Sequence, residues 1–377
     1  MKLLKLINEI VKFFKQPKNI VILILGPLFL TLLFGGVYMK DYLNDIPIVV
    51  LDMDNSSSSR MIVSEFENND RYYVASRVNS FEELKYSIDS KESHMGIYIP
   101  KDFNKDIKKQ KSSSVALIID ESNITVGNTA LSSASEILAT LNAGINIKIL
   151  QAKGIDPKTS YDLAKIFNFE SRVLYDAKYT YKGYVMPGII LVFVQQLFLS
   201  AFIPAIMDDK ENIFIKSIVY ATVASLTYVL CALILKNIFH VNFTGSLLYA
   251  FLYATIFILT LVGPGMIIGA LFKDKLKVTQ FTMLLSMPTF LTAGYAWPVE
   301  QTPVVLSYII KMIWPLIYAI APIRDILVKS TPVSIFAKDI MCLILFGCIW
   351  ALIGYNLFKR TFKNDNRGGI SEQQGAV

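Results

Sequence analysis

Long runs of apolar residues without charge dominate the hydrophobic pattern of this chain. A helix needs about 20 such residues to cross a bilayer. Runs of about that length or longer occupy residues 19–38, 184–207, 217–235, 246–272, 278–297 and 340–358. A soluble protein with a large core would place charged residues among its apolar ones. The pattern therefore predicts an α-helical polytopic membrane protein with six spans.

Residues 1–18 are predicted to form an amphipathic interfacial helix, followed by the first transmembrane helix at residues 19–40. Lys5, Lys12 and Lys15 fall on the polar face of the first helix, opposite an apolar face of leucine, isoleucine and phenylalanine. Lysine-rich helices of this kind lie flat among lipid headgroups. A signal peptide is the competing interpretation, but no small-residue cleavage site follows. We therefore expect a cytoplasmic N-terminus.

The polar segment of residues 41–182 is predicted to be an inserted extracellular α/β domain. The expected strands are 46–51, 72–78, 96–99 and 115–119, and the expected helices are 81–90, 123–151 and 158–179. Strands that alternate with helices are typical of an α/β fold. The serine run Ser56 to Ser59 is expected to be a solvated loop. All three cysteines lie in apolar runs, so no disulfide framework is expected in this domain.

Residues 183–358 are expected to hold five transmembrane helices and an outer hairpin at residues 298–336. Lys311 and Pro315 interrupt the apolar part of this hairpin. If the hairpin crossed the membrane fully, the basic tail at residues 359–377 would lie outside, against the positive-inside rule. We therefore predict a re-entrant or interfacial hairpin, six spans and a cytoplasmic tail.

A short, charge-dense turn at residues 208–216 separates the second and third apolar runs. An apolar patch follows the charges directly, which is more typical of a docking surface than of a linker. An ordinary solvated hairpin loop is the alternative. The candidate docking residues are Asp208, Asp209, Lys210, Glu211 and Phe214.

The charge distribution and the missing motifs narrow the classes of function. The net charge is +7, but residues 39–183 hold 18 basic and 20 acidic residues, so the basic excess lies near the apolar runs. Anionic lipids and the positive-inside rule explain this excess, and no nucleic-acid partner is needed. The apolar runs contain no Asp, Glu, Lys, Arg or His, which argues against a proton-coupled transporter. The sequence has no G-x-x-x-x-G-K-[ST] loop, so the chain cannot hydrolyse ATP through a P-loop.

A few polar residues remain as candidate sites. The chain has two histidines, which excludes a histidine-rich metal site. Gln195 and Gln196 lie inside the second apolar run, where they either line a substrate path or hydrogen-bond a neighbouring helix.

The order of these segments resembles the ABC-2 type permeases of ATP-binding-cassette exporters. Residues 96–103 (GIYIPKDF) followed by 115–120 are similar to the external-domain signature of that family. Residues 208–216 stand where the family places its main coupling helix, although Asp208-Asp209-Lys210 replaces the commoner acidic-basic-acidic start. Residues 288–298 (PTFLTAGYAWP), followed by 314–319, are similar to its outer hairpin.

The resemblance implies a half-transporter without its own ATPase site or cofactor. Two ABC ATPase subunits would bind ATP and Mg²⁺, and a second permease chain would complete a homodimer or heterodimer in a bacterial plasma membrane. ATP-driven closure of the ATPase subunits would move the permeases through the coupling turn and the N-terminal helix. The cargo is left open, with a slight preference for an amphiphilic drug, a lipid or a peptide.

Two other classes of function remain as alternatives. One is a surface receptor or secretion-accessory membrane protein whose external domain binds a ligand without transport. The other is a membrane-embedded hydrolase, which the apolar character of the runs disfavours. Co-purification of an ATPase would distinguish the exporter from both.

Overall fold

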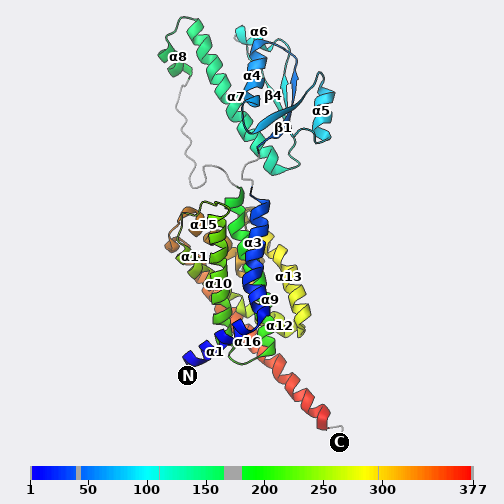
Figure 1. Cartoon of the computed structure of the whole chain (residues 1–377), viewed down its shortest axis with the longest axis vertical. Coiled ribbons are helices and arrows are strands. Elements are labelled where there is room, and N and C mark those ends of the chain that lie inside the picture. The colour runs from blue at the N-terminus through cyan, green and yellow to red at the C-terminus, as the bar shows by residue number, and fades with distance from the viewer. Residues whose placement is uncertain (1, 40–43, 110, 165–180, 296, 375–377) are drawn as a thin grey trace. The chain divides into compact units, whose positions relative to one another are not determined.

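The computed structural model describes the chain except for residues 1, 40–43, 110, 165–180, 296 and 375–377. Its internal contacts divide the chain into two compact units (Figure 1). The helical unit comprises Met1–Asp41 and Val173–Val377, and the α/β unit comprises Tyr42–Arg172. The α/β unit is therefore inserted into the sequence of the helical unit.

The α/β unit contains one mixed sheet of four strands. The strands are β1 (Ile46–Asp52), β2 (Tyr72–Arg77), β3 (Met95–Ile99) and β4 (Ala116–Ile119), in the order β2-β1-β3-β4. The central strand β1 pairs in parallel with β2 and β3, whereas β3 and β4 are antiparallel. The four strands expected from the sequence are thus confirmed, with ends within one residue of those expected.

Helices cover both faces of this sheet (Figure 1). They are α4 (Ser57–Glu67), α5 (Phe81–Asp89), α6 (Phe103–Lys108) and α7 (Ile124–Ala152), while α8 (Pro157–Ala164) packs against α7. Successive residues of β1 point to opposite faces. Ile48 and Val50 join the core beneath α4 and α7, while Val49 and Leu51 pack with Leu84 of α5. The unit is therefore a three-layer α/β/α sandwich.

The expectation of a solvated loop at Ser56 to Ser59 is wrong, because these residues begin helix α4. The Ser56 hydroxyl accepts a hydrogen bond from the Ser59 amide at 3.1 Å. The buried Ser59 hydroxyl donates to the Asp52 carboxylate at 2.7 Å. A serine at this position satisfies an amide that the helix leaves unpaired. Helix α6 was also not expected, and most of the helix expected at 158–179 lies outside the described residues.

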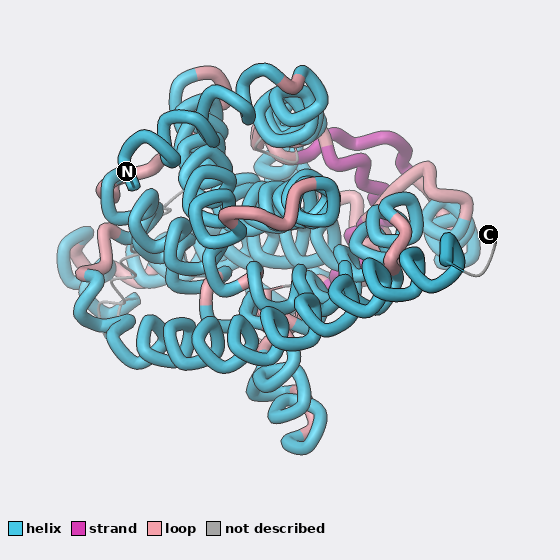
Figure 2. The backbone as a smooth tube through the Cα atoms, turned by 90° about the horizontal axis from the view of Figure 1, so that it is seen from below, coloured by secondary structure: helices cyan, strands magenta, loops and turns pink. Residues whose placement is uncertain are grey.

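The helical unit starts with α1 (Lys2–Lys15) and a composite first span. This span joins α2 (Pro17–Ile20), a π-helical turn at Val21–Leu25 and α3 (Gly26–Val37). The later helices are α9 (Tyr181–Asp208), α10 (Ile213–Asn237), α11 (Leu247–Thr260), α12 (Val262–Phe272), α13 (Lys275–Thr292), α14 (Val304–Ile313), α15 (Ile320–Lys329) and α16 (Ala337–Gln374). Figure 2 shows that helix prevails among the described residues, whose strands form one small sheet.

Five helical segments among the described residues are long and apolar enough to cross a membrane. They are Pro17–Val37, Lys182–Asp208, Ile213–Asn237, Leu247–Phe272 and Val333–Phe362. Helix α13, expected as a further span at 278–297, ends at Thr292 and is not among the five, because two lysines and many hydroxyl side chains reduce its apolarity. Helix α14 and the segment Pro315–Lys329 meet at an angle of 96°, as in a broken span or a re-entrant hairpin.

Helix α9 is the central element of the helical unit. It packs against α3, α10, α12, α13 and α15. Helices α12 and α16 approach each other closely through glycine, since a Cβ atom on Gly354 would lie 2.5 Å from the Gly263 carbonyl oxygen. Small residues permit such close backbone packing between membrane helices.

Candidate functional site

The turn between α9 and α10 is shorter than the sequence suggests. Helix α9 continues through Asp208 and α10 begins at Ile213, so residues 209–212 alone form the turn. Asn212 adopts the left-handed conformation, with φ of 54°. Asparagine tolerates this conformation better than most residues. The apolar patch that follows the charges is therefore the first turn of α10.

Lys216 braces this turn from inside. Its side chain is 5% exposed, and its Nζ lies 2.8 Å from the Asp209 carboxylate. The same ammonium donates to the carbonyl oxygen of Glu211 at 3.0 Å and to that of Asp209. A buried charge is tolerated only when it is paired and hydrogen-bonded. Lys216 therefore fixes the path of the backbone through the turn.

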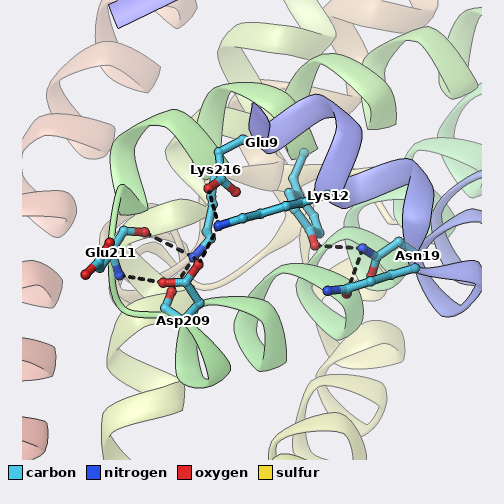
Figure 3. A network of polar contacts seen from close by, with 8 residues as sticks. Glu9, Lys12, Asn19, Asp209, Glu211 and Lys216 are labelled. Carbon is cyan, nitrogen blue, oxygen red and sulfur yellow. Dashed lines mark hydrogen bonds and ion pairs between the residues drawn. The ribbon is translucent and has the colours of Figure 1, made fainter. Parts of the chain in front are cut away.

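The N-terminal helix α1 contacts this turn through Lys12 (Figure 3). The Lys12 Nζ lies 3.4 Å from the Asp209 carboxylate and 3.2 Å from the Glu9 carboxylate. Both Lys12 and Lys216 thus share Asp209 as a partner. The side chain of Glu9 is 6% exposed, although it carries a charge.

Aromatic and amide contacts attach the same helix to α10. The ring of Phe13 meets the ring of Tyr220 edge to face, with 4.9 Å between centroids. Asn19, just after α1, donates a hydrogen bond to the Tyr220 hydroxyl at 2.9 Å. Phe13 and Asn19 are both buried. Part of helix α1 is therefore packed against the rest of the protein, while Leu3 and Ile7 are exposed. The sequence suggested instead that the whole apolar face of this helix would contact lipid.

Asp208 connects the turn to two further segments. Its carboxylate pairs with Lys275 at the start of α13 and lies 3.7 Å from Lys18 of α2. Lys210 lies over the ring of Phe362 in α16, with 4.4 Å from Nζ to the ring centroid. We call the ionic part of this arrangement the charge cluster: Glu9, Lys12, Lys18, Asp208, Asp209, Lys216 and Lys275.

Within the charge cluster, the pKa values of Lys12 and Asp209 are shifted toward the charged forms. A hydrogen bond to Glu9 is the main reason that the pKa of Lys12 is raised, and Asp209 adds to this effect. The hydrogen bond from Lys216 holds the pKa of Asp209 below its usual value, although partial burial opposes this shift. Lys12 and Asp209 are therefore both charged at neutral pH and form their ion pair.

The candidate residues of the turn divide into two groups. Asp208 and Asp209 pair within the chain, whereas Glu211 and Phe214 are exposed and the ring of Phe214 is 78% exposed. Of the three candidate lysines of α1, Lys12 belongs to the charge cluster, while Lys5 and Lys15 are exposed.

Sequence reasoning missed several members of the charge cluster. Glu9, Lys216 and Lys275 come from three separate segments, and their pairing depends on tertiary packing. The one available signal was a lysine, Lys216, at the polar edge of an apolar run.

The two glutamines of α9 differ in their surroundings. Gln195 accepts a hydrogen bond from the Trp314 indole at 3.2 Å and donates to Thr289 at 3.4 Å. Gln195 therefore hydrogen-bonds neighbouring segments, as one of the two interpretations of the sequence held: its side chain joins α9 to α13 and to the hairpin. The buried Nε2 of Gln196 and Oγ of Ser200, one turn further along α9, have no hydrogen-bond partner among the described residues. Gln196 therefore remains a candidate for contact with another molecule.

Comparison with known proteins decides the family. The profile of the family described as "ABC-2 family transporter protein" matches residues 18–356. The chain belongs to this ABC-2 family. Its expected resemblance is thus confirmed over nearly the whole chain, and the protein is a multi-pass membrane component of an ABC transporter.

Curated relatives of this ABC-2 protein include two permeases of Escherichia coli K12. The probable multidrug ABC transporter permease YbhR is 23% identical over 362 residues, which cover 92% of each chain. The probable multidrug ABC transporter permease YbhS is 21% identical over 147 residues, or 39% of each chain. No solved structure matches this ABC-2 chain.

Proposed function

We propose that this ABC-2 protein is the permease half of an ATP-driven exporter in a bacterial plasma membrane. Two separate ATPase subunits would bind ATP and Mg²⁺, and a second permease chain, identical or related, would complete the transporter. The α/β unit would lie outside the cell, and the charge cluster would lie on the cytoplasmic side. Lys5 and Lys15 would contact anionic lipid headgroups there.

The exposed Phe214 beside the braced turn is the observation that carries this proposal. An exposed aromatic ring would be costly to leave in water unless lipid or another protein covers it. The backbone below it is fixed by Lys216, which has hydrogen bonds to Asp209 and Glu211. A rigid base suits a residue that receives force, because movement at the ring is then passed to α9 and α10.

The charge cluster extends this movement to other segments. Lys12 links the turn to α1, and Lys275 links it to the start of α13. A push by an ATPase subunit at Phe214 would therefore displace three parts of the permease together. This supports a mechanism in which ATP-driven closure changes the arrangement of the membrane helices.

We further propose that the cargo is amphiphilic and passes near Gln196. The names of the relatives include the word "multidrug", which supports export of an amphiphilic drug, lipid or peptide. The unpaired amide of Gln196 and hydroxyl of Ser200 offer a small polar site on an otherwise apolar helix. Such a site would bind a polar group of a mostly apolar cargo.

The test compares Phe214→Ala with Glu211→Ala. An aromatic anchor commonly carries about 2 kcal/mol or more, so Phe214→Ala is expected to weaken ATPase binding by about 30-fold. An exposed ion pair contributes about 0–1 kcal/mol, so Glu211→Ala should change binding by about fivefold at most. Retention of the ATPase on the purified permease and substrate-stimulated ATP hydrolysis are measured for both.

The two variants are matched because both side chains are exposed and neighbouring in sequence. Both proteins should therefore insert and fold like the parent chain. If Phe214→Ala retained its ATPase and its coupling, Phe214 would be a lipid anchor and the docking surface would lie elsewhere.

A further inference from the structure

The α/β unit contains a cavity of about 990 Å³ that the proposed export mechanism does not use. It lies between α6, the segment after α6 and the C-terminal half of α7. Figure 1 shows α7 continuing well past the sheet, with α8 beside its far end. The volume is at the upper end of the range for small-molecule sites, about 300–1,000 Å³.

One side of the cavity is an apolar stripe of α7. Leu138, Leu141, Ile145 and Ile149 line it, and their spacing of three or four residues places them on one helical face. At the end near the sheet, the cavity reaches the core side chain Phe103. The stripe continues the hydrophobic core beyond the edge of the sheet, where apolar surface gains free energy if a ligand covers it.

The polar residues of the cavity favour a negatively charged ligand. Lys111 and Lys153 both line it and are exposed, and none of the described lining residues is acidic. Asn142 and Asn146 add amide groups along the same helix. Lysine stems can lie along apolar surface while the ammonium groups stay at the opening.

A second cavity on another side of α7 lacks this charge pattern. It has a volume of about 510 Å³ and is lined by both acidic and basic residues, including Glu65, Glu136, Arg71 and Lys148. The combination of an apolar stripe with basic residues alone therefore distinguishes the larger of these two cavities from the smaller one.

The shape of the cavity favours a long ligand. Its α7 lining extends from Leu138 to Leu150, which is about 18 Å at 1.5 Å per residue. A compact ligand would leave much of this stripe uncovered, whereas an extended acyl chain would follow it.

We propose that this cavity binds a single-chain anionic amphiphile, such as a long-chain fatty acid. The acyl chain would lie along Leu141, Ile145 and Ile149, and the carboxylate would pair with Lys111 or Lys153. This proposal concerns a ligand of the α/β unit and does not depend on the proposed export function.

The test uses the full chain in lipid nanodiscs and a palmitic-acid analogue with a mid-chain diazirine. After illumination, mass spectrometry locates the cross-linked residues. Saturable labelling is expected within residues 138–149 of α7. Ala139→Trp should reduce this labelling at least fivefold, because Ala139 is an exposed residue that lines the cavity and a large ring there would fill it.

Thr140→Trp is the matched control, since Thr140 is also exposed and adjacent but lines the second cavity. It should leave the labelling unchanged. Charge reversal by Lys111→Glu with Lys153→Glu, or use of the methyl ester of the probe, should also reduce labelling at least fivefold. Equal labelling of Ala139→Trp and Thr140→Trp would overturn the site. If the methyl ester labelled the chain as well as the acid does, the cavity would have no preference for an anionic ligand.

Discussion

At the scale of single residues, Lys216 determines the conformation of the turn between α9 and α10. Its ammonium group bonds one carboxylate and two backbone carbonyl oxygens, all from Asp209 and Glu211. No neutral side chain of similar length could supply three hydrogen bonds from one atom. The turn therefore depends on a side chain from the first turn of the helix that follows it, α10.

Lys216→Met is expected to destabilise the protein by about 1–3 kcal/mol, because it leaves these acceptors without their donor. The melting temperature of the purified chain in nanodiscs measures the change. Lys210→Met is the control, since Lys210 is exposed and contacts an aromatic ring instead. Equal melting temperatures for the two variants would show that Lys216 does not brace the turn.

The pKa of Asp209 gives the contact between α1 and the turn a defined pH dependence. Because its pKa is below the usual 3.8 in the folded chain, the ionised carboxylate stabilises the fold above that value. This stabilisation is lost as the pH falls through the lower, folded-state pKa. We expect the distribution of distances between labels at Lys5→Cys and Glu211→Cys to stay narrow from pH 8 to about 4 and to broaden only as the pH falls below 3.8.

Electron paramagnetic resonance on a background without Cys231, Cys342 and Cys348 measures this distance. Asp209→Asn should give a broad distribution that does not change with pH. A narrow distribution at every pH in the parent chain would show that the ion pairs of Asp209 do not hold α1 in place.

At the scale of helices and strands, uniform apolar runs were predictable and their ends were not. Helices α9 and α10 follow the predicted runs closely, because backbone groups in a bilayer must pair within their own helix. Helix α16 contains its predicted run of residues 340–358 but continues to Gln374. The end of α13 at Thr292 and the cap at Ser56 depend on local hydrogen bonds that periodicity does not reveal. The turn was correctly located, but the predicted residues 208–216 are more than twice as many as residues 209–212, which form the turn.

The candidate site was predictable only in part for a different physical reason. The charges of residues 208–211 are contiguous and visible in the sequence. Their partners Lys12 and Lys275 are distant in the chain, and a sequence does not indicate which charges meet. The sequence alone therefore could not show that Asp209 pairs with lysines of its own chain while Phe214 is exposed.

The packing of α12 against α16 provides a test at the scale of elements. A Cβ atom on Gly263 would overlap the backbone of Trp350, whereas one on Gly36 would meet no atom within 4 Å. Gly263→Ala is therefore expected to reduce the melting temperature and the yield of folded protein. Gly36→Ala, in another apolar helix, should change neither. Loss of yield in both variants would indicate a general effect of helix glycines rather than this contact.

At the scale of the whole molecule, the number of spans decides where the C-terminus lies. The five clear spans would place the two termini on opposite sides of the membrane, whereas a sixth span, either α13 or the bent pair of α14 and Pro315–Lys329, would return them to the same side. The basic tail favours the second arrangement, because lysine and arginine accumulate on the cytoplasmic side.

Cysteine labelling distinguishes these arrangements. Ser57→Cys, an exposed position of the α/β unit, should react with a membrane-impermeant maleimide on intact cells. Asn366→Cys should react only after the membrane is permeabilised. Both are made on a background without native cysteines. Reaction of Asn366→Cys on intact cells would rule out an even number of spans.

Asp208 and Asp209 each form ion pairs with lysines of their own chain. This has a consequence for which ATPase subunits a permease can work with. The residues that shape the turn are satisfied within the permease, so those that an ATPase would recognise, Phe214 and Glu211, can vary without harm to the fold. A few exposed side chains on a turn of fixed conformation would then determine which ATPase a permease can bind. Exchange of these residues alone is expected to let this permease work with the ATPase of a different exporter.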